Sequence, residues 1–469
     1  MSRLFSDQPG DDGLPGAERR LAVIVLIIGT LMAVLDGSIV NIALPTIADE
    51  LQAPASTTIW VANAFRLINA MGLISFAALG DVIGYRRVYL FGLIVFTLAS
   101  LGCALSDAMT PLIAMRGLQG FGAAATLSVG PALYRTIFPK RLLGSAVGLS
   151  ALVVAAGMAA GPSIGGGILA VLGWPWLFAL NVPLGVVTYY IALKALPREN
   201  GRGGRFDIAG ALLSAISLGA FVLAVDGLSG QSNTDWVLPL FVASLVSGLV
   251  FVHWQRRVPH PLLPLDIFQS RRFSMAAITS FLAFTAQGIT FITLPFLFQS
   301  IQGYSPFMSA VLFTPWPIVI IAAGPTAGRL SDRFNPALIS TGGLVIFCLG
   351  LVALALLGTT ASMTDILWRT ALCGLGYGFF QAPNNHELLG NVPRERSGSA
   401  SGVLASARTF GQALGAAFVA IVLARAAGSA TASTTMAIAP VRLALWIGVA
   451  TAAIALLVSA ARIAARRTH

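Results

Sequence analysis

The sequence predicts an all-α polytopic membrane protein, and three observations lead to this prediction. Of the 469 residues, 56% are hydrophobic and only 10% are charged, whereas a soluble domain carries about 25% charged residues. The apolar residues come in runs of about 20, the length with which a helix crosses a bilayer. The charged residues collect between these runs and form no basic face, so the net charge of +11 does not indicate a nucleic-acid partner.

We count fourteen apolar runs, and each is predicted to be one transmembrane helix. The fifth and sixth runs are separated only by the short LGWPW stretch at 172–176. In chain order the runs are 21–46, 57–79, 88–106, 110–134, 145–171, 175–194, 207–226, 236–255, 273–298, 306–329, 336–358, 364–389, 398–423 and 440–463.

The connections between the runs differ in their basic residues. Lys and Arg gather in alternate connections, while the remaining connections hold little beyond Arg425 and Arg442. Basic connections stay in the cytoplasm, so both termini are predicted to be cytoplasmic, in agreement with an even number of helices. Residues 1–20 are polar and rich in Gly and Pro. We expect them to form a disordered tail without a cleavable signal peptide.

The chain contains an internal repeat. Residues 116–161 align with residues 370–415 at an offset of 254, which places the GSA of 144–146 on the GSA of 398–400. Two similar halves are typical of transporters that rock around a central path. The predicted domains are an N-terminal tail (1–20), a six-helix bundle (21–200), an inserted two-helix hairpin (201–258), a second six-helix bundle (259–463) and a C-terminal tail (464–469).

Five short motifs follow one another along the first half. In chain order they are LDGSIVNIALP (35–45), AALGDVIGYRR (77–87), RGLQGFGAA (116–124), GMAAGPSIGG (157–166) and WPWLFALNVPLG (174–185). With these motifs the sequence resembles the major facilitator superfamily, in particular its fourteen-helix drug:proton antiporters. The second motif departs from the family pattern, because Ala77 replaces a glycine and Val82 an arginine. The resemblance implies the major facilitator fold, with two six-helix bundles and two extra linker helices, and it implies proton-coupled export.

Two of these motifs have a direct physical interpretation. In the fourth motif, small residues expose the backbone on one helix face and allow close packing, and a proline bends the helix. The residues of this motif are Gly157, Gly161, Pro162, Gly165 and Gly166. The second motif forms a charge cluster at the cytoplasmic surface that repeats in the second half, with residues Asp81, Gly84, Arg86, Arg87, Asp332 and Arg333. Such a cluster is either a solvated face or a gating latch; the repeat favours a latch, weakened in the first half by Val82.

Three charged residues lie at similar depth inside the predicted spans. Asp36 is roughly 13 Å from the outer end of its helix at 1.5 Å per residue, and Arg66 and Arg116 lie in the same layer. A buried ion pair would keep Asp36 ionised, whereas an isolated Asp36 could exchange a proton near neutral pH. We predict that Asp36 couples transport to protons or substrate with Arg116 as its partner, and a purely structural ion pair is the alternative. Arg66 is either a further participant or a static partner.

The second half and the predicted cavity supply further candidates. Secondary relay candidates are Arg369, Arg408, His386 and Glu387; the last two lie near a helix end, where a solvated terminus is the alternative interpretation. Predicted cavity residues are Asn41, Asn63, Asn69, Gln119, Gln287, Phe284 and Phe291, any of which could instead be a packing residue.

The sequence therefore predicts a proton-driven exporter of lipophilic, preferentially cationic compounds in the inner (plasma) membrane. The alternatives are an exporter of one dedicated metabolite and a proton-coupled nutrient importer. We expect no enzyme activity, no metal and no cofactor beyond the proton gradient, because nucleophile, metal-ligand and nucleotide-binding motifs are missing from the sequence. The expected partners are a lipophilic small molecule, protons and the lipid bilayer, and the expected oligomeric state is a monomer.

Overall fold

The computed structural model describes residues 2–9, 11–53, 55–58, 60–198, 201, 203–229, 235–259, 261–263, 265–304, 306–393, 396–429 and 438–464. Throughout these residues the regular structure is helical. The main helices are α1 (Gly16–Glu50), α2 (Ala55–Thr58), α3 (Trp60–Ile83), α4 (Tyr85–Ala104), α5 (Met109–Ile137), α6 (Leu143–Leu172), α7 (Pro175–Ala179), α8 (Asn181–Ala195), α9 (Ile208–Ser229), α10 (Val237–Gln255), α11 (Arg271–Pro295), α12 (Pro306–Phe313), α13 (Pro315–Ser331), α14 (Pro336–Ala355), α15 (Met363–Gly390), α16 (Ser397–Ser429) and α17 (Ile438–Ala464).

Each predicted apolar run is largely helical over its described residues, and several of the runs cover more than one helix: the second run falls on α2 and α3, and the ninth passes from α11 into a short π-helix at Phe296. The sixth run divides into α7 and α8, and the tenth divides into α12 and α13 at Thr314, next to Pro315. The separation of the fifth and sixth runs is confirmed, because Gly173 has a φ of +83° that ends α6. Ten of the described helices are long and apolar enough to cross a membrane. The count of fourteen spans stays a prediction.

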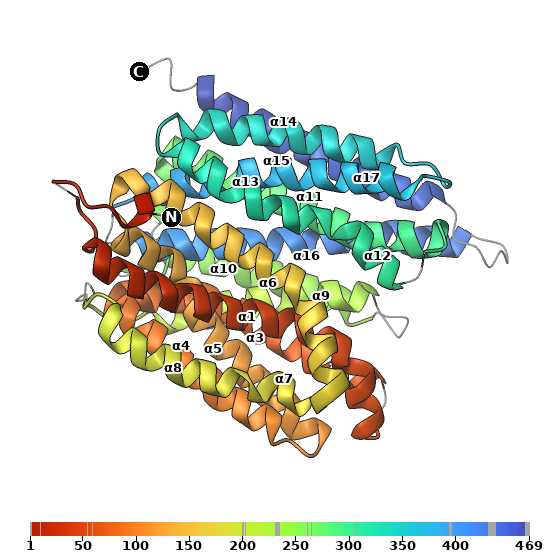
Figure 1. The fold of residues 1–469 in the computed structure, drawn as a ribbon, viewed down its shortest axis with the longest axis horizontal. Helices are drawn as coiled ribbons and strands as arrows, with labels where there is room; N and C mark the ends of the chain where they lie inside the picture. The colour runs from red at the N-terminus through yellow and green to blue at the C-terminus, as the bar shows by residue number, and fades with distance from the viewer. Residues whose placement is uncertain are drawn as a thin grey trace.

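The helices form two groups that meet along a central plane (Figure 1). In the first group α5 packs against α3 and α4, while α1 packs against α6 and α8. In the second group α15 packs against α13 and α14, while α11 packs against α16 and α17. The two groups meet through α6 with α13 and through α3 with α16. The helices of the predicted inserted hairpin, α9 and α10, pack on each other, and α9 lies along α3 and α16.

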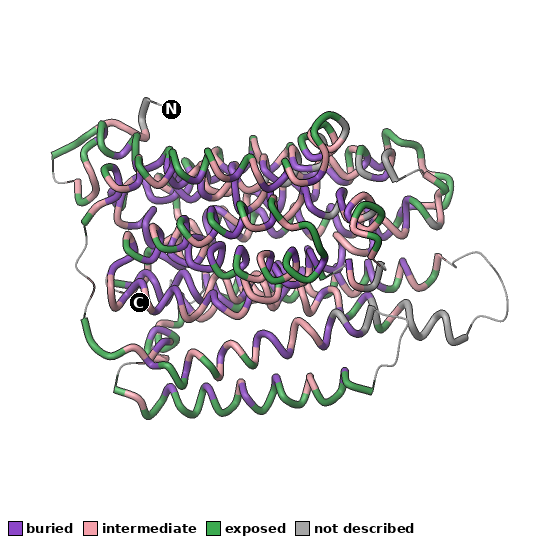
Figure 2. The backbone as a smooth tube through the Cα atoms, turned by 90° about the horizontal axis from the view of Figure 1, so that it is seen from below, coloured by how far each residue is buried: buried purple, intermediate pink, exposed green. Residues whose placement is uncertain are grey.

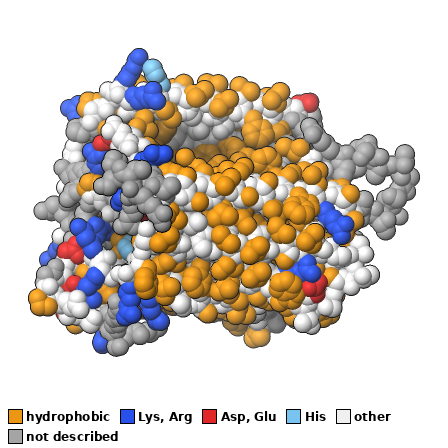
Figure 3. Space-filling view, turned by 90° about the horizontal axis from the view of Figure 1, so that it is seen from above, with side chains coloured by type: hydrophobic (Ala, Val, Ile, Leu, Met, Phe, Trp, Pro, Cys, Tyr) orange, Lys and Arg blue, Asp and Glu red, His pale blue; other side chains and the backbone are white. Residues whose placement is uncertain are grey.

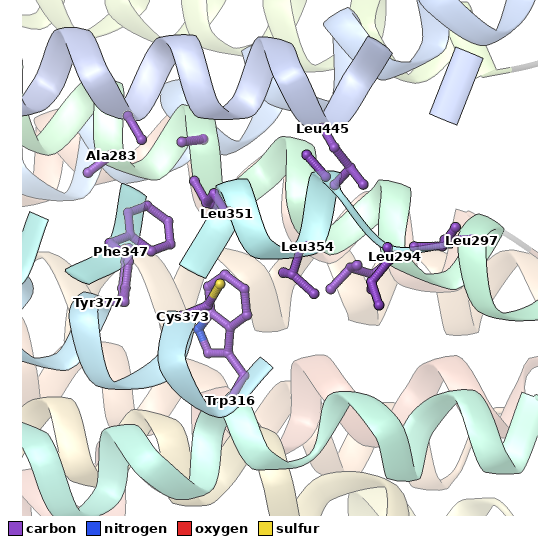
Figure 4. Close-up of a cluster of buried hydrophobic side chains, with 14 of the residues drawn as sticks. Ala283, Leu294, Leu297, Trp316, Phe347, Leu351, Leu354, Cys373, Tyr377 and Leu445 are labelled. Atoms are coloured by element: carbon purple, nitrogen blue, oxygen red, sulfur yellow. The ribbon is translucent and has the colours of Figure 1, made fainter. Parts of the chain in front are cut away.

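Buried residues lie in the interior of each group, while peripheral helices carry the exposed positions (Figure 2). One large apolar cluster belongs to the second group and is built around Trp316, Phe347 and Tyr377, which Figure 4 shows packed with leucines from α11, α14 and α17. Leucines also lie on the outer surface of the helix bundle, where a helix that faces lipid exposes apolar side chains. Leu245 and Leu249 of α10, for example, are more than 60% exposed.

One end of the bundle is strongly basic. We call it the basic end and define it as the end at which α1 begins and α17 ends. Figure 3 shows Lys and Arg side chains gathered there, beside a broad apolar band over the middle of the molecule. This separation of charge from apolar surface fits a molecule whose middle faces lipid.

The N-terminal segment packs on the basic end, so the expectation of a disordered tail is wrong for its described residues. The Leu14 amide donates to the Ile137 carbonyl at 2.9 Å, which joins the segment to the end of α5. The Arg141 guanidinium donates to both carboxylate oxygens of Asp11 at 2.7 Å. Polar composition predicted disorder because the sequence did not reveal that two acidic side chains of the segment, Asp11 and Asp12, meet the basic α5–α6 connection.

Candidate functional site

Asp81 joins the two groups of helices at the basic end. It lies in the last turn of α3, before the Gly84 turn, whose φ of +98° favours glycine. Its side chain is 9% exposed. One carboxylate oxygen accepts the Gly398 amide at 3.0 Å, and the other accepts the Ser399 amide at 3.1 Å and the Ser399 hydroxyl at 2.7 Å. We call this contact the first latch.

A second contact of the same kind links the groups in the opposite direction. Asp332, directly after α13, accepts the Gly144 amide at 2.9 Å and the Ser145 amide at 3.2 Å. The Ser145 hydroxyl also donates to it. We call this contact the second latch. In both latches a carboxylate satisfies first-turn amides of α16 or α6, which have no partner within their own helix and carry the positive end of its dipole.

Glycines allow the close approach of the helices at the latches. A Cβ on Gly148 of α6 would lie 2.6 Å from the Gly324 carbonyl oxygen of α13, and one on Gly398 would lie 2.6 Å from the Ala77 carbonyl oxygen of α3. A substitution at either glycine would therefore force the helices apart. The sequence repeat contained both donor sequences, GSA at 144–146 and at 398–400, but the repeat alone did not show that they bind Asp332 and Asp81.

The other predicted residues of the charge cluster have separate contacts. Arg86 donates to the Leu193 carbonyl, Arg87 donates to the Ile83 carbonyl at 3.3 Å, and Arg333 is exposed. Asp81 additionally accepts the Tyr85 hydroxyl at 2.7 Å. The burial of Asp81 against the opposite group argues against a solvated loop cluster.

Asp36 lies near the middle of α1 and is buried inside the first group. Its side chain is 1% exposed and forms a salt bridge with Arg116 of α5, whose side chain is also 1% exposed. Its other carboxylate oxygen accepts the side-chain amides of Gln119 at 2.8 Å and Asn181 at 3.1 Å. Three helices, α1, α5 and α8, thus supply one buried polar cluster, which we call the Asp36 cluster.

Arg116 is held in this cluster by further contacts. Its Nε donates to the Val61 carbonyl at 2.8 Å, and its guanidinium lies 4.5 Å from the ring centre of Phe65 and 5.5 Å from that of Phe178. Of the two arginines considered from the sequence, the structure pairs Arg116 with Asp36. Arg66 is exposed and lines the central cavity instead. Asn181 is a cluster member that the sequence analysis missed, although it lies in the LNVPLG motif of the sixth run.

A cavity of about 460 Å³ lies between the two groups, within the range of small-molecule sites. Its walls come from both groups and from Val222 of α9. Predicted cavity residues that line it are Asn69 and Phe284, and the secondary candidate Arg408 lines it too.

Other predicted cavity residues lie elsewhere. Gln119 belongs to the Asp36 cluster. Gln287 is buried behind the wall, where it accepts the side-chain amide of Gln412, a wall residue, at 3.1 Å. Phe291 packs 5.2 Å from Trp316, ring centre to ring centre, in the aromatic core. Asn63 is half-buried on α3, and the side chain of Asn41 lies outside the described residues.

His386 and Glu387 belong to a polar network near the basic end. Glu387 is 3.4 Å from Arg462, which also donates to Asn384 at 2.8 Å and is 2% exposed. The His386 ring lies 3.1 Å from the Ser331 hydroxyl, one residue before Asp332. The interpretation as a solvated terminus is therefore wrong. Arg462 was not predicted from the sequence, because it lies on α17, far along the chain from α15.

Arg369 has a local role. It pairs with Asp365 one turn earlier, at 2.8 Å, and both side chains are partly exposed. The structure therefore gives Arg369 no counterpart of the buried Asp36–Arg116 pair.

The glycine-rich motif of α6 packs against α1, as its small residues predicted. Added Cβ atoms on Gly157 and Gly165 would lie 2.9 Å from Val34 and 2.8 Å from Ile39, and one on Gly161 would overlap Ser38. These contacts flank Asp36 along α1. A Cβ on Gly166 would meet open space, and the side chain of Pro162 lies outside the described residues.

The molecule has two similar groups of membrane-type helices around a central cavity, and reciprocal contacts join the groups at one end. This arrangement is the one found in secondary membrane transporters. A family model for the Major Facilitator Superfamily matches residues 26–416. The chain belongs to this superfamily, in the branch that contains its drug-efflux proteins. It is thus a multi-pass membrane transporter of small molecules.

The similar proteins include both drug exporters and other transporters. The uncharacterized transporter YebQ of Escherichia coli is 42% identical, over 91% of this chain and 94% of that protein. The riboflavin transporter RibZ of Clostridioides difficile is 32% identical, over 86% and 87%. The multidrug resistance protein Stp of Mycobacterium tuberculosis is 32% identical, over 86% and 76%. The structure of the human organic anion transporter MFSD10 is similar in fold, with a TM-score of 0.66 at 14% identity over 94% of this chain and 99% of that one.

Proposed function

We propose that this protein is a proton-coupled antiporter that exports lipophilic organic compounds across the cytoplasmic membrane. The observation that carries the proposal is a cavity between two similar groups, closed at one end by two reciprocal latches. The positive-inside rule assigns the basic end to the cytoplasm. Both termini then lie in the cytoplasm, and the proposed number of membrane spans is fourteen. The latches then close the cytoplasmic side, and breaking them opens the cavity to that side.

Proton coupling is assigned to the Asp36 cluster. A buried ion pair resists loss of one partner, because the other charge would remain desolvated and uncompensated. Protonation of Asp36 therefore requires Arg116 to find new partners, and α1, α5 and α8 must shift when it does. Because α6 packs against α1 beside Asp36, and the second latch binds the first turn of α6, such a shift reaches the latch. This path gives the proton a physical means of biasing the closed state.

The test is substrate-driven proton movement in proteoliposomes that contain a pH-reporting dye. Asp36→Asn should lower the proton flux that a transported compound elicits at least tenfold, since the amide cannot exchange a proton. The matched control is Asp365→Asn, which breaks an Asp–Arg pair of the second group that is partly exposed. Full coupling in Asp36→Asn would make the Asp36 cluster structural and move the search to Glu387 and His386.

Export of one dedicated metabolite is the second candidate function. It is favoured by the similarity to the riboflavin transporter RibZ, which is comparable in extent to the similarity to Stp. A panel of chemically unrelated compounds separates the two candidates: a multidrug exporter moves several of them, whereas a dedicated exporter moves one chemical series.

A further inference from the structure

The charges on the central cavity wall are all positive among the described residues. Arg66 enters from α3 and Arg408 from α16, and the described lining contains no Asp or Glu. The carboxylate of Asp36 is turned into the first group, where it is paired with Arg116. The sequence predicted a preference for cations, but the described wall residues include no carboxylate that could bind one.

Arg408 is available to a ligand. The described residues give its guanidinium no hydrogen bond and no ion pair, and its nitrogen atoms are not among the buried unsatisfied atoms, so they reach the cavity. A desolvated guanidinium without a counterion is costly. An anion that binds beside it would remove that cost, and Arg offers a planar set of donors that suits a carboxylate.

The neighbours of the two arginines complete an amphipathic site. Asn69 follows Arg66 by one turn on α3, and its buried Oδ1 has no hydrogen-bond partner. Gln412 follows Arg408 by one turn on α16. Apolar walls from Leu73 and Phe284 provide room for a hydrophobic body.

We propose that the exported compounds are amphipathic organic anions, with an acidic group bound by Arg408 and Arg66 and an apolar body against the cavity walls. This proposal rests on the proposed export function and names its substrate class. Export of a monovalent anion in exchange for one inward proton moves two charges in the same electrical sense. A membrane potential that is negative inside therefore accelerates it, whereas exchange of a monovalent cation for one proton is electrically neutral.

The experiment uses three probes with the same ring system and different charge: naphthalene-2-carboxylate, naphthalene-2-carboxamide and naphthalen-2-ylmethylammonium. Binding to the purified full-length protein is measured by calorimetry, and transport is measured in proteoliposomes with a pH gradient, with and without a potassium diffusion potential. The variants are Arg408→Gln, Arg66→Gln and the charge-preserving Arg408→Lys. Arg272→Gln, an exposed arginine at the start of α11, is the matched control.

We expect the carboxylate to bind roughly tenfold or more tightly than the amide, the size of one charge-assisted hydrogen bond. Arg408→Gln should remove this difference, Arg408→Lys should keep part of it, and Arg272→Gln should leave it unchanged. Transport of the carboxylate should increase with the imposed potential. Preferential binding of the ammonium probe, or a carboxylate preference that persists in both glutamine variants, would overturn the anion site.

The outcomes separate the two proposals. Transport of the amide or ammonium probe at the rate of the carboxylate, with no effect of Arg408→Gln, would leave the exporter in place and overturn the substrate class. Carboxylate binding that depends on Arg408, without proton-driven transport of any probe, would support the anion site and contradict the export function.

Discussion

The first and second latches use the same chemistry in different surroundings. Each consists of one aspartate at the end of a helix and the GS pair that begins a helix of the other group. The first latch is buried, and Tyr85 adds a hydrogen bond to Asp81. The second latch is only partly buried, and the pKa of the nearby Arg141 is raised by its hydrogen bond to Asp11 and, less strongly, by the negative charge of Asp332.

The difference in burial shows how a repeated sequence can give closing contacts of unequal strength. Hydrogen bonds are stronger where water is excluded, because the local dielectric is lower. The first latch should therefore contribute most of the closing free energy. The second latch remains accessible to modulation, since α6, whose first-turn amides donate to Asp332, follows the connection on which the N-terminal segment packs.

The largest effect is expected for Asp81→Asn. The amide keeps the shape of the side chain but loses its charge, which costs about 1.5–3 kcal/mol for hydrogen bonds to a charged group. The closed state should lose population by roughly 10- to 100-fold relative to the open state. Distances between spin labels at Phe91 of α4 and Leu338 of α14, both exposed, measured in a variant without native cysteines, would report opening of the basic end. An unchanged distance distribution would show that the first latch does not hold the closed state.

A smaller effect is expected for Asp332→Asn, about 1 kcal/mol, because water partly replaces the lost contacts. The same spin labels should show about a fivefold shift toward the open state. Asp266→Asn is the control, since its exposed ion pair with Arg396 joins residues of the predicted second bundle. If Asp332→Asn opened the molecule more than Asp81→Asn, burial would not determine which latch is stronger. The weaker first latch would then be better explained by Val82, which stands where the family pattern has an arginine.

The apolar runs predicted the helices well, because a membrane helix is a long apolar segment. The runs 88–106 and 336–358 match α4 and α14 to within three residues. The interruption of the tenth run at Thr314 was not predicted. A proline within a membrane helix does not say by itself whether the helix bends or divides.

The site was predicted in part. Asp36 and Arg116 were identified as charged residues inside apolar runs, where a carboxylate needs a partner. The structure shows that the two residues pair. Arg66 lies at the same depth but points into the cavity, and depth along a helix does not give the direction in which a side chain points. The latch partners at 144–145 and 398–399 bind mainly through backbone amides, which any residue except proline possesses, and the Ser145 and Ser399 hydroxyls add one hydrogen bond each. The repeat showed these serines, but residue type carries no signal for the backbone amides.

The smallest effect is expected for the N-terminal segment, which should act on the second latch alone. The Arg141 hydrogen bond lowers the pKa of Asp11 below its ordinary value of 3.8. A lowered pKa means that the contact stabilises the packed segment above the ordinary pKa and is lost as the pH falls through the lower value. Between pH 5 and 8 we therefore expect no change in packing, and release only below about pH 3.8. Fluorescence anisotropy of a probe at Gln8, which is exposed, would follow the release.

Arg141→Gln should loosen the segment at neutral pH, while the Leu14–Ile137 and Asp12–Lys140 hydrogen bonds remain, and should shift the spin-label distribution toward the open state by less than about 1 kcal/mol, because partly exposed ion pairs are weak. In the Asp332→Asn background the same change should have no further effect, since the second latch is already broken, whereas in the Asp81→Asn background it should add to the opening. Equal effects in the two backgrounds would mean that the segment does not act through the second latch, and the two latches would then differ only in burial.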